Sequence, residues 1–237
     1  MRINVHAGHN PAGKVACGAV GLINESTENR RVKEEVISQL RELGHTVYDC
    51  TCDNGTGQTD VLQKIVAKCN AHEVDLDVSI HFNSGAGDQA GNDKTTGVEA
   101  YVYSASSAAK SYAEKICQAV ADQGFRNRGV KYSTTLYVLK HTKAPAVLVE
   151  CCFVDDRDDV ELYDYQKMAA AIVYGITGQS IQESQETAPA DPGEETPVGN
   201  PKELYRVQVG AYGVKANADA MKARLQEAGF DAIIVKA

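Results

Sequence analysis

Hydrophobic and polar positions alternate along the first 178 residues with two different periods. Segments with the period of a strand lie at 3–5, 46–50, 76–82, 98–103, 136–140 and 146–150. Segments with the period of a helix lie at 26–43, 60–72, 106–123 and 159–177. Because strands and helices alternate, the pattern predicts an α/β domain with a mixed, largely parallel sheet flanked by helices.

Single residues indicate some boundaries of these elements. Gly44 and Gly124 follow two of the helical segments and are expected to end them, since glycine readily adopts the left-handed conformation at a helix C-terminus. Asp60 is expected to cap the helix 60–72. The segment 84–97 is too polar and too rich in glycine to be core, so it is expected to be a loop.

The composition changes after Gly178. Residues 179–201 contain four of the six prolines and no aromatic residue, which is typical of a flexible linker. The chain then returns to a pattern of strand, helix and strand, too small to fold alone. We therefore expect a folded domain at 1–178, an acidic, proline-rich linker at 179–203 and a small β-α-β element at 204–237.

Charge and composition exclude some classes of protein. The net charge is −8, and residues 180–201 hold five acidic residues and no basic one, so binding to nucleic acid is not expected. No apolar run approaches the roughly 20 residues that span a bilayer. The seven cysteines include no C-x-x-C pair, which favours reduced thiols. A strand begins near residue 2, so we expect synthesis in the cytoplasm without a signal peptide.

Three ionisable residues come at the ends of predicted strands. His9 follows the first strand, His81 follows Leu76–Ile80, and Glu150 follows the apolar run Ala146–Val149. The carboxyl ends of parallel strands meet at one edge of a sheet, where α/β proteins bind ligands. Two imidazoles and a carboxylate with an open fourth position are the ligands of catalytic zinc, so the sequence predicts a Zn²⁺ site here.

Helix geometry suggests which carboxylate joins the two histidines. At about 100° per residue, Glu25 lies about 30° from the centre of the apolar stripe of helix 26–43, whereas Glu28 lies about 90° away. Glu25 is therefore expected to point inward and Glu28 toward solvent. The alternative is that Glu25 only provides a favourable negative charge at the start of the helix.

Four motifs, HAGHN, INESTEN, SIHFN and AVLVECCF, occur in this order. Over residues 1–178 the chain thereby resembles the type-3 group of zinc-dependent N-acetylmuramoyl-L-alanine amidases, which includes phage endolysins. The resemblance implies a phosphorylase/hydrolase-like α/β fold and hydrolysis of the amide between the lactyl group of N-acetylmuramic acid and L-alanine in peptidoglycan. It also implies that His9, Glu25 and His81 bind Zn²⁺ and that Glu150 is the catalytic acid–base residue.

Other polar residues near these motifs are interpreted as structural. The family commonly has Asp-Pro where this chain has His6-Ala7, which affects the hydrogen bonding expected around His9. His6, Glu99 and the thiols of Cys151 and Cys152 are expected to have structural roles. Arg128 is a candidate contact for substrate carboxylates, but we interpret it as an ordinary surface residue and leave it out of the site.

The C-terminal segment resembles the first half of a SPOR domain, a peptidoglycan-binding module with two β-α-β repeats. One repeat is present before Ala237, which suggests that two chains form a homodimer by pairing their half-modules. The alternative is that the tail is a degenerate or truncated module. The overall expectation is a lytic amidase of the endolysin or mother-cell-lysis type that acts at the bacterial cell wall after release. The alternatives are a non-catalytic peptidoglycan-binding protein and a zinc carboxypeptidase-like hydrolase, although the His-x-x-Glu motif of the latter is absent from the sequence.

Overall fold

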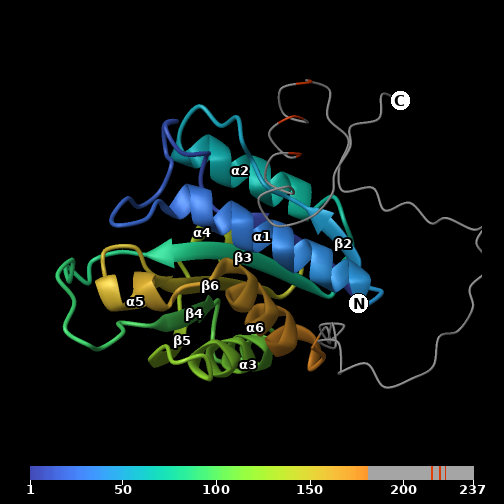
Figure 1. The fold of residues 1–237 in the computed structure, drawn as a ribbon. Helices are drawn as coiled ribbons and strands as arrows, with labels where there is room; N and C mark the ends of the chain where they lie inside the picture. The colour runs from blue at the N-terminus through green and yellow to red at the C-terminus, as the bar shows by residue number, and fades with distance from the viewer. Residues whose placement is uncertain (181–214, 216–218, 220–221, 223–237) are drawn as a thin grey trace, which may run out of the picture. The chain divides into compact units, whose positions relative to one another are not determined.

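The computed structural model describes residues 1–180 together with Lys215, Asp219 and Lys222. The elements of residues 1–180 are β1 (Arg2–Ala7), α1 (Glu25–Glu42), β2 (Thr46–Asp49), α2 (Gln58–Cys69), β3 (Leu76–Asn83), β4 (Val98–Val102), α3 (Lys110–Ala121), β5 (Asn127–Tyr132), α4 (Tyr137–His141), β6 (Ala146–Phe153), α5 (Arg157–Leu162) and α6 (Tyr165–Thr177) (Figure 1). In this described part no helix is both long and apolar enough to cross a membrane.

The strands form one sheet in the order β2-β1-β3-β6-β4-β5. Neighbouring strands are parallel except for β4 and β6, which run antiparallel. The expected mixed, largely parallel sheet is thereby confirmed. The parallel pairs bring the carboxyl ends of β1, β3 and β6 to the same edge of the sheet.

Each face of the sheet is covered by its own helices. The larger apolar cluster contains side chains of α1, α3 and α6, and α3 and α6 lie side by side (Figure 1). The smaller cluster contains side chains of α2 and α4. Successive residues of a strand point to opposite faces, so Val147 and Val149 join the larger cluster while Leu148 joins the smaller one. Glu150, two residues after Leu148, therefore lies on the same face of the sheet as Leu148.

Two predictions in the middle of the chain were wrong. Residues 136–140 are not a strand, because Tyr137–His141 forms the short helix α4. A brief apolar run has no periodicity that distinguishes a strand from a helix. The strand of this region is β5, Asn127–Tyr132, which we did not predict. Its sequence is polar because it lies at the edge of the sheet and stays partly exposed.

Helix boundaries differ from the expectation at two aspartates. The predicted helix 159–177 is interrupted, because the side chain of Asp164 accepts hydrogen bonds from the backbone of Gln166 and Lys167 and starts α6 anew. Asp60 does not cap α2, which begins after Gly57. Its carboxylate instead accepts a hydrogen bond from the backbone N–H of Thr56.

The chain divides into two compact units, Met1–Gln185 and Glu186–Ala237. The predicted linker 179–203 and the predicted β-α-β element 204–237 fall almost wholly outside the described residues, as does the surface of the predicted homodimer. Their structure and the three domain boundaries therefore stay predictions.

Candidate metal centre

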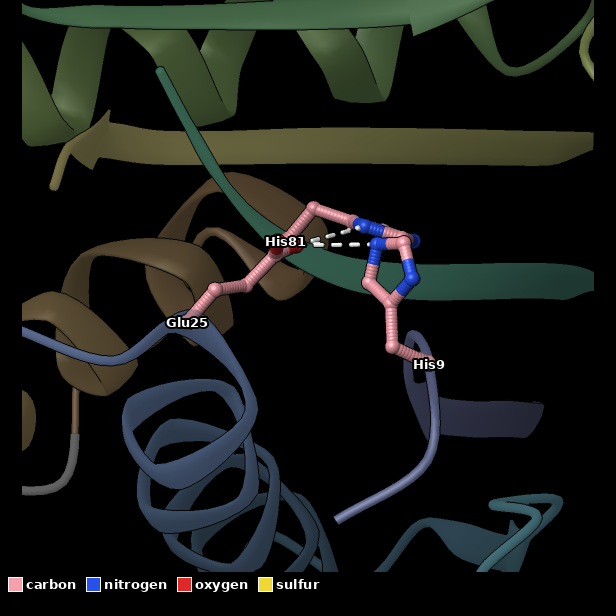
Figure 2. A group of neighbouring side chains, drawn as sticks. All are labelled: His9, Glu25 and His81. Carbon is pink, nitrogen blue, oxygen red and sulfur yellow. Dashed lines mark hydrogen bonds and ion pairs between the residues drawn. The ribbon is translucent and has the colours of Figure 1, made fainter. Parts of the chain in front are cut away.

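Three side chains from distant parts of the sequence converge at the carboxyl edge of the sheet. His9 comes from the turn after β1, Glu25 is the first residue of α1, and His81 lies on β3 (Figure 2). One Glu25 oxygen, Oε1, lies 2.9 Å from His81 Nδ1 and 3.3 Å from His9 Nε2. One potential ligand atom from each residue lies within 4.8 Å of the others. Two imidazoles and one carboxylate suit a zinc ion with an open fourth position.

Glu25 is held firmly in this position. Asn24 caps α1 by accepting a hydrogen bond from the backbone N–H of Ser26, which places Glu25 in the first turn. Its carboxylate is buried and accepts hydrogen bonds from the backbone of Ala19 and Phe82. Burial acts to raise the pKa of Glu25, but the hydrogen bonds and charges of His81 and His9 outweigh it and hold that pKa well below its ordinary value. The carboxylate is therefore ionised and available to a cation.

Two glycines leave the room that these side chains need. A Cβ atom on Gly8 would overlap the imidazole of His81. A Cβ atom on Gly18 would overlap the carboxylate of Glu25, and Gly18 has a φ of +78°, which side chains rarely tolerate. The glycine that precedes His9 is thus required by the packing of the site.

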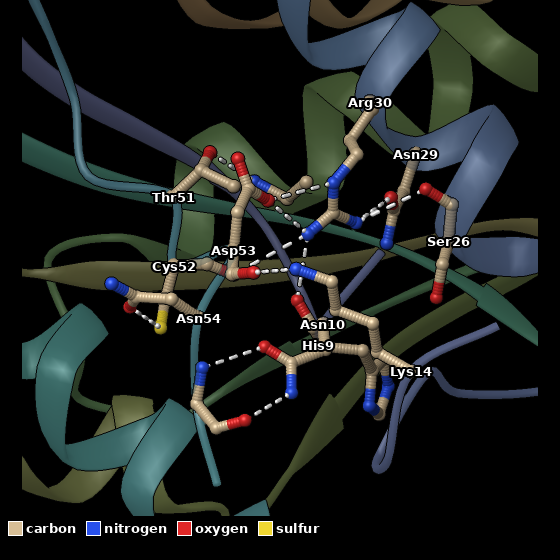
Figure 3. Close-up of polar contacts among 12 residues, drawn as sticks. His9, Asn10, Lys14, Ser26, Asn29, Arg30, Thr51, Cys52, Asp53 and Asn54 are labelled. Carbon is tan, nitrogen blue, oxygen red and sulfur yellow. Dashed lines mark hydrogen bonds and ion pairs between the residues drawn. The ribbon is translucent and has the colours of Figure 1, made fainter. Parts of the chain in front are cut away.

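The backbone around His9 is fixed by α1. His9 itself has a φ of +63°, a left-handed conformation that is uncommon outside glycine. Arg30 donates one hydrogen bond to the carbonyl of His9 at 2.8 Å and another to the carbonyl of Ser26 at 3.0 Å (Figure 3). Asn29 donates to the carbonyl of Gly8 at 3.0 Å. Sequence reasoning missed Arg30; its only signal is its place one turn after Ser26, near the start of α1.

Glu150 lies beside this cluster on the neighbouring strand. In the pairing of β3 with β6 it stands opposite His81, and in the pairing of β4 with β6 it stands opposite Glu99. Among the described residues its Oε2 is buried and has no hydrogen-bond partner. Burial first, and then the charges of Glu25 and Glu99, raise the pKa of Glu150 to about 8. A carboxyl group whose pKa lies near neutrality is suited to proton transfer.

Three of the residues interpreted as structural, His6, Cys151 and Cys152, are buried. His6 Nδ1 lies 3.5 Å from Ser79 Oγ, and burial, followed by the charge of His81, lowers the pKa of His6 to about 3. All seven cysteines are free. The thiols of Cys151 and Cys152 are completely buried, which raises their pKa values well above the ordinary range.

Glu28 was predicted wrongly. Its side chain is only 11% exposed, because it accepts a hydrogen bond from the hydroxyl of Tyr163 at 3.1 Å and pairs with Arg31. The angle on α1 places Glu28 at the rim of the helix's own apolar stripe. The residue that covers it comes from the junction of α5 and α6, which no pattern within α1 reveals.

The loop 84–97 is fastened to the segment that follows β6. Asp155 accepts hydrogen bonds from the backbone of Gly85, Ala86 and Gly87. Asp156 and Asp159 accept from the backbone of Thr96 and Gly97, and Asp158 accepts from the backbone of Asn92. Every one of these donors is a backbone N–H group. The loop beside His81 is therefore ordered by four aspartates of one short segment.

A mixed α/β sheet that brings two histidines, a buried glutamate and a neighbouring carboxyl group to its carboxyl edge is an arrangement typical of metal-dependent hydrolases. Comparison with known proteins narrows this class. Residues 3–178 match the Amidase_3 family, described as N-acetylmuramoyl-L-alanine amidase, and the chain belongs to that family. Residues 198–237 match the SPOR domain, which confirms the resemblance of the C-terminal segment.

Two curated relatives and one solved structure show how much of the chain is similar to known proteins. CPE1502 of Clostridium perfringens is 37% identical over 78% of this chain and 52% of its own length. The N-acetylmuramoyl-L-alanine amidase CwlM of Bacillus licheniformis is 33% identical over 75% of this chain and 63% of its own length. The chain thus spans about half to two thirds of the first curated relatives that it matches. The catalytic domain of the CD27L endolysin targeting Clostridia difficile has a TM-score of 0.67 and 26% identity, covering 76% of this chain and 99% of that one.

Proposed function

We propose that the protein is a zinc-dependent amidase that hydrolyses the bond between the lactyl group of N-acetylmuramic acid and L-alanine in peptidoglycan. The observation that carries the proposal is the convergence of His9, Glu25 and His81 with Glu150 opposite His81 on the next strand. The family match and the amidase names of relatives such as CwlM support the choice of substrate.

His9, Glu25 and His81 would hold the Zn²⁺, which when bound polarises the scissile carbonyl and increases the acidity of the attacking water. The ionised form of Glu150 takes a proton from that water at its free Oε2 and returns it to the nitrogen of the leaving L-alanine. Because Glu25 stays ionised and Glu150 has a pKa of about 8, the two carboxyl groups are suited to different tasks.

The other parts of the chain receive roles that follow from this activity. Residues 1–178 form the catalytic domain, 179–203 the linker and 204–237 a peptidoglycan-binding element, supported by the SPOR match. The enzyme acts at the bacterial cell wall, as an endolysin or in the lysis of a mother cell. The homodimer expected from the sequence finds no support in the comparisons, so it is not part of the proposal.

Digestion of purified sacculi by the full-length, zinc-loaded protein tests the proposal. We expect new L-alanine amino termini without new reducing sugars. Glu150→Gln should slow their release by about 10²–10⁴-fold, because it removes the proton acceptor. The matched control is Glu114→Gln on α3, where the exposed carboxylate is remote from the sheet edge.

Three results would contradict the proposal in different ways. Release of amino termini other than L-alanine would favour the carboxypeptidase-like alternative. Binding to sacculi without any release would favour the non-catalytic alternative. Equal rates for the parent and for Glu150→Gln would refute the role of Glu150 alone.

A further inference from the structure

Ionisable side chains continue across the sheet beyond the candidate metal centre. His81 on β3, Glu150 on β6 and Glu99 on β4 occupy paired positions on three adjacent strands. Paired residues of adjacent strands point to the same face, with about 5 Å between them. Arg128 on the edge strand β5 extends the row, because its Nε lies 2.7 Å from Glu99 Oε2.

The guanidinium group of Arg128 is held in one orientation. Its partner Glu99 is only 3% exposed and is itself fixed by hydrogen bonds from Asn83 Nδ2 and the Tyr101 hydroxyl, both at 2.9 Å. The guanidinium carbon also lies 4.9 Å from the centre of the Phe153 ring. A side chain fixed in this way loses little conformational freedom when it binds a ligand.

Arg128 still has donors to offer. Only Nε is used by Glu99, and no residue of the described part accepts a hydrogen bond from Nη1 or Nη2. The side chain is 30% exposed, so these two nitrogens can reach a molecule in solvent. Paired terminal nitrogens of arginine match the two oxygens of a carboxylate.

The charges along the row restrict what can bind. Glu25, Glu150 and Glu99 are carboxyl groups, and an anionic part of a substrate would be repelled by those that are ionised. Arg128 provides the compensating positive charge at the far end of the row. The sum of one strand spacing and one hydrogen-bond length, with the width of the guanidinium group, puts its terminal nitrogens about 7–10 Å from Glu150.

This separation corresponds to about two residues of an extended peptide counted from the leaving amine, which span roughly 7 Å. We propose that Arg128 binds a carboxylate of the stem peptide, on the residue that follows L-alanine, and thereby determines which stem peptides are cleaved. The inference rests on the proposed function and identifies the part of the substrate that the same site recognises. It also revises the interpretation of Arg128 as an ordinary surface residue.

The test uses two synthetic substrates of the zinc-loaded, full-length protein. Both are N-acetylmuramoyl-L-alanyl dipeptides whose second residue is D-glutamate with its γ-carboxyl group blocked as a methylamide, and the α-carboxyl group of that residue is free in one and a primary amide in the other. Only a carboxylate is exchanged for a primary amide. We expect the parent to show a kcat/KM about 10–100 times higher for the carboxylate, the range of a charge-assisted hydrogen-bonded pair.

Arg128→Gln should reduce this preference to within about twofold while changing the rate with the amide substrate much less. Arg126→Gln is the matched control, because Arg126 is an exposed arginine two residues earlier, and it should keep the preference of the parent. The double variant Glu99→Gln/Arg128→Gln removes the ion pair as a whole, so Glu99 is not left as a buried charge without its partner. It should also lose the preference.

Two results would overturn the inference without affecting the proposed function. They are a parent enzyme that cleaves both substrates at equal rates, and an Arg128→Gln variant that slows both substrates by the same factor, as a purely structural residue would. If the parent cleaved neither substrate and produced no new L-alanine amino termini in sacculi, the proposed function would fail, and this inference with it.

Discussion

Replacing Arg30 with alanine removes the side chain that joins the turn of His9 to α1. The arginine is 17% exposed and donates well-formed hydrogen bonds to the carbonyls of His9 and Ser26. Hydrogen bonds that involve a charged group contribute about 1.5–3 kcal/mol each. The ion pair with Asp53, whose side chain is 63% exposed, adds less than about 1 kcal/mol. We expect the free energy of unfolding to fall by about 3–5 kcal/mol.

The same substitution should weaken zinc binding. The left-handed backbone of His9 costs about 1–3 kcal/mol and persists because Arg30 and Asn29 hold the turn in place. Once Arg30 is absent, the turn can relax and move the imidazole away from Glu25. Loss of a residue that orients a metal ligand lowers affinity about 10–100-fold.

Urea unfolding of the metal-free protein measures the first effect, and competition with a chromogenic zinc chelator measures the second. Arg31→Ala is the control, since its side chain is 51% exposed and pairs with Glu28 rather than with the turn of His9. The reasoning is refuted if Arg30→Ala binds zinc within twofold of the parent while His9→Ala loses binding.

Three further outcomes are expected. Gly8→Ala should lower zinc affinity at least about tenfold in the same chelator assay, because the added methyl group displaces the imidazole of His81; unchanged affinity would contradict the packing argument. In the metal-free protein the stabilisation that Glu150 alone contributes should fall by roughly 3–5 kcal/mol as the pH rises from about 4.5 to 8. Glu150 keeps its proton over this range only in the folded protein. In urea unfolding, the midpoint of Glu150→Gln should therefore fall less with rising pH than the midpoint of the parent. Asp159→Asn should cost about 1–3 kcal/mol and speed hydrogen exchange at the backbone of Gly97, whereas unchanged protection would argue against this anchor of the loop.

The sequence was sufficient to predict which side chains meet at the sheet edge. His9, His81 and Glu150 each follow an apolar strand, and parallel pairing carries the ends of such strands to one place. Glu25 could be predicted to point inward, toward the two histidines, because it lies close to the centre of the apolar stripe of its own helix. These predictions depend on periodicity, which a single chain reveals directly.

Contacts between elements could not be predicted in the same way. Glu28 is covered by Tyr163, and Arg30 reaches the turn of His9; both contacts depend on how α1 packs against other segments. The edge strand β5 is polar because one of its sides has no neighbouring strand. Its pattern therefore predicted neither the strand nor the pairing of Arg128 with Glu99. Patterns along the chain describe a residue's own element better than the elements packed against it.

The four aspartates between Asp155 and Asp159 have a consequence for how the loop 84–97 can change. They hold the loop through its backbone N–H groups, which nearly every residue type provides. The exposed side chains that make none of these bonds, such as those of Gln89, Ala90 and Lys94, can therefore be exchanged without loosening the loop's attachment, provided that no proline replaces a donor. The attachment of the loop thus depends on other residues than its exposed surface, and a library of variants at Gln89, Ala90 and Lys94 would change the surface of the loop while the fold stays intact.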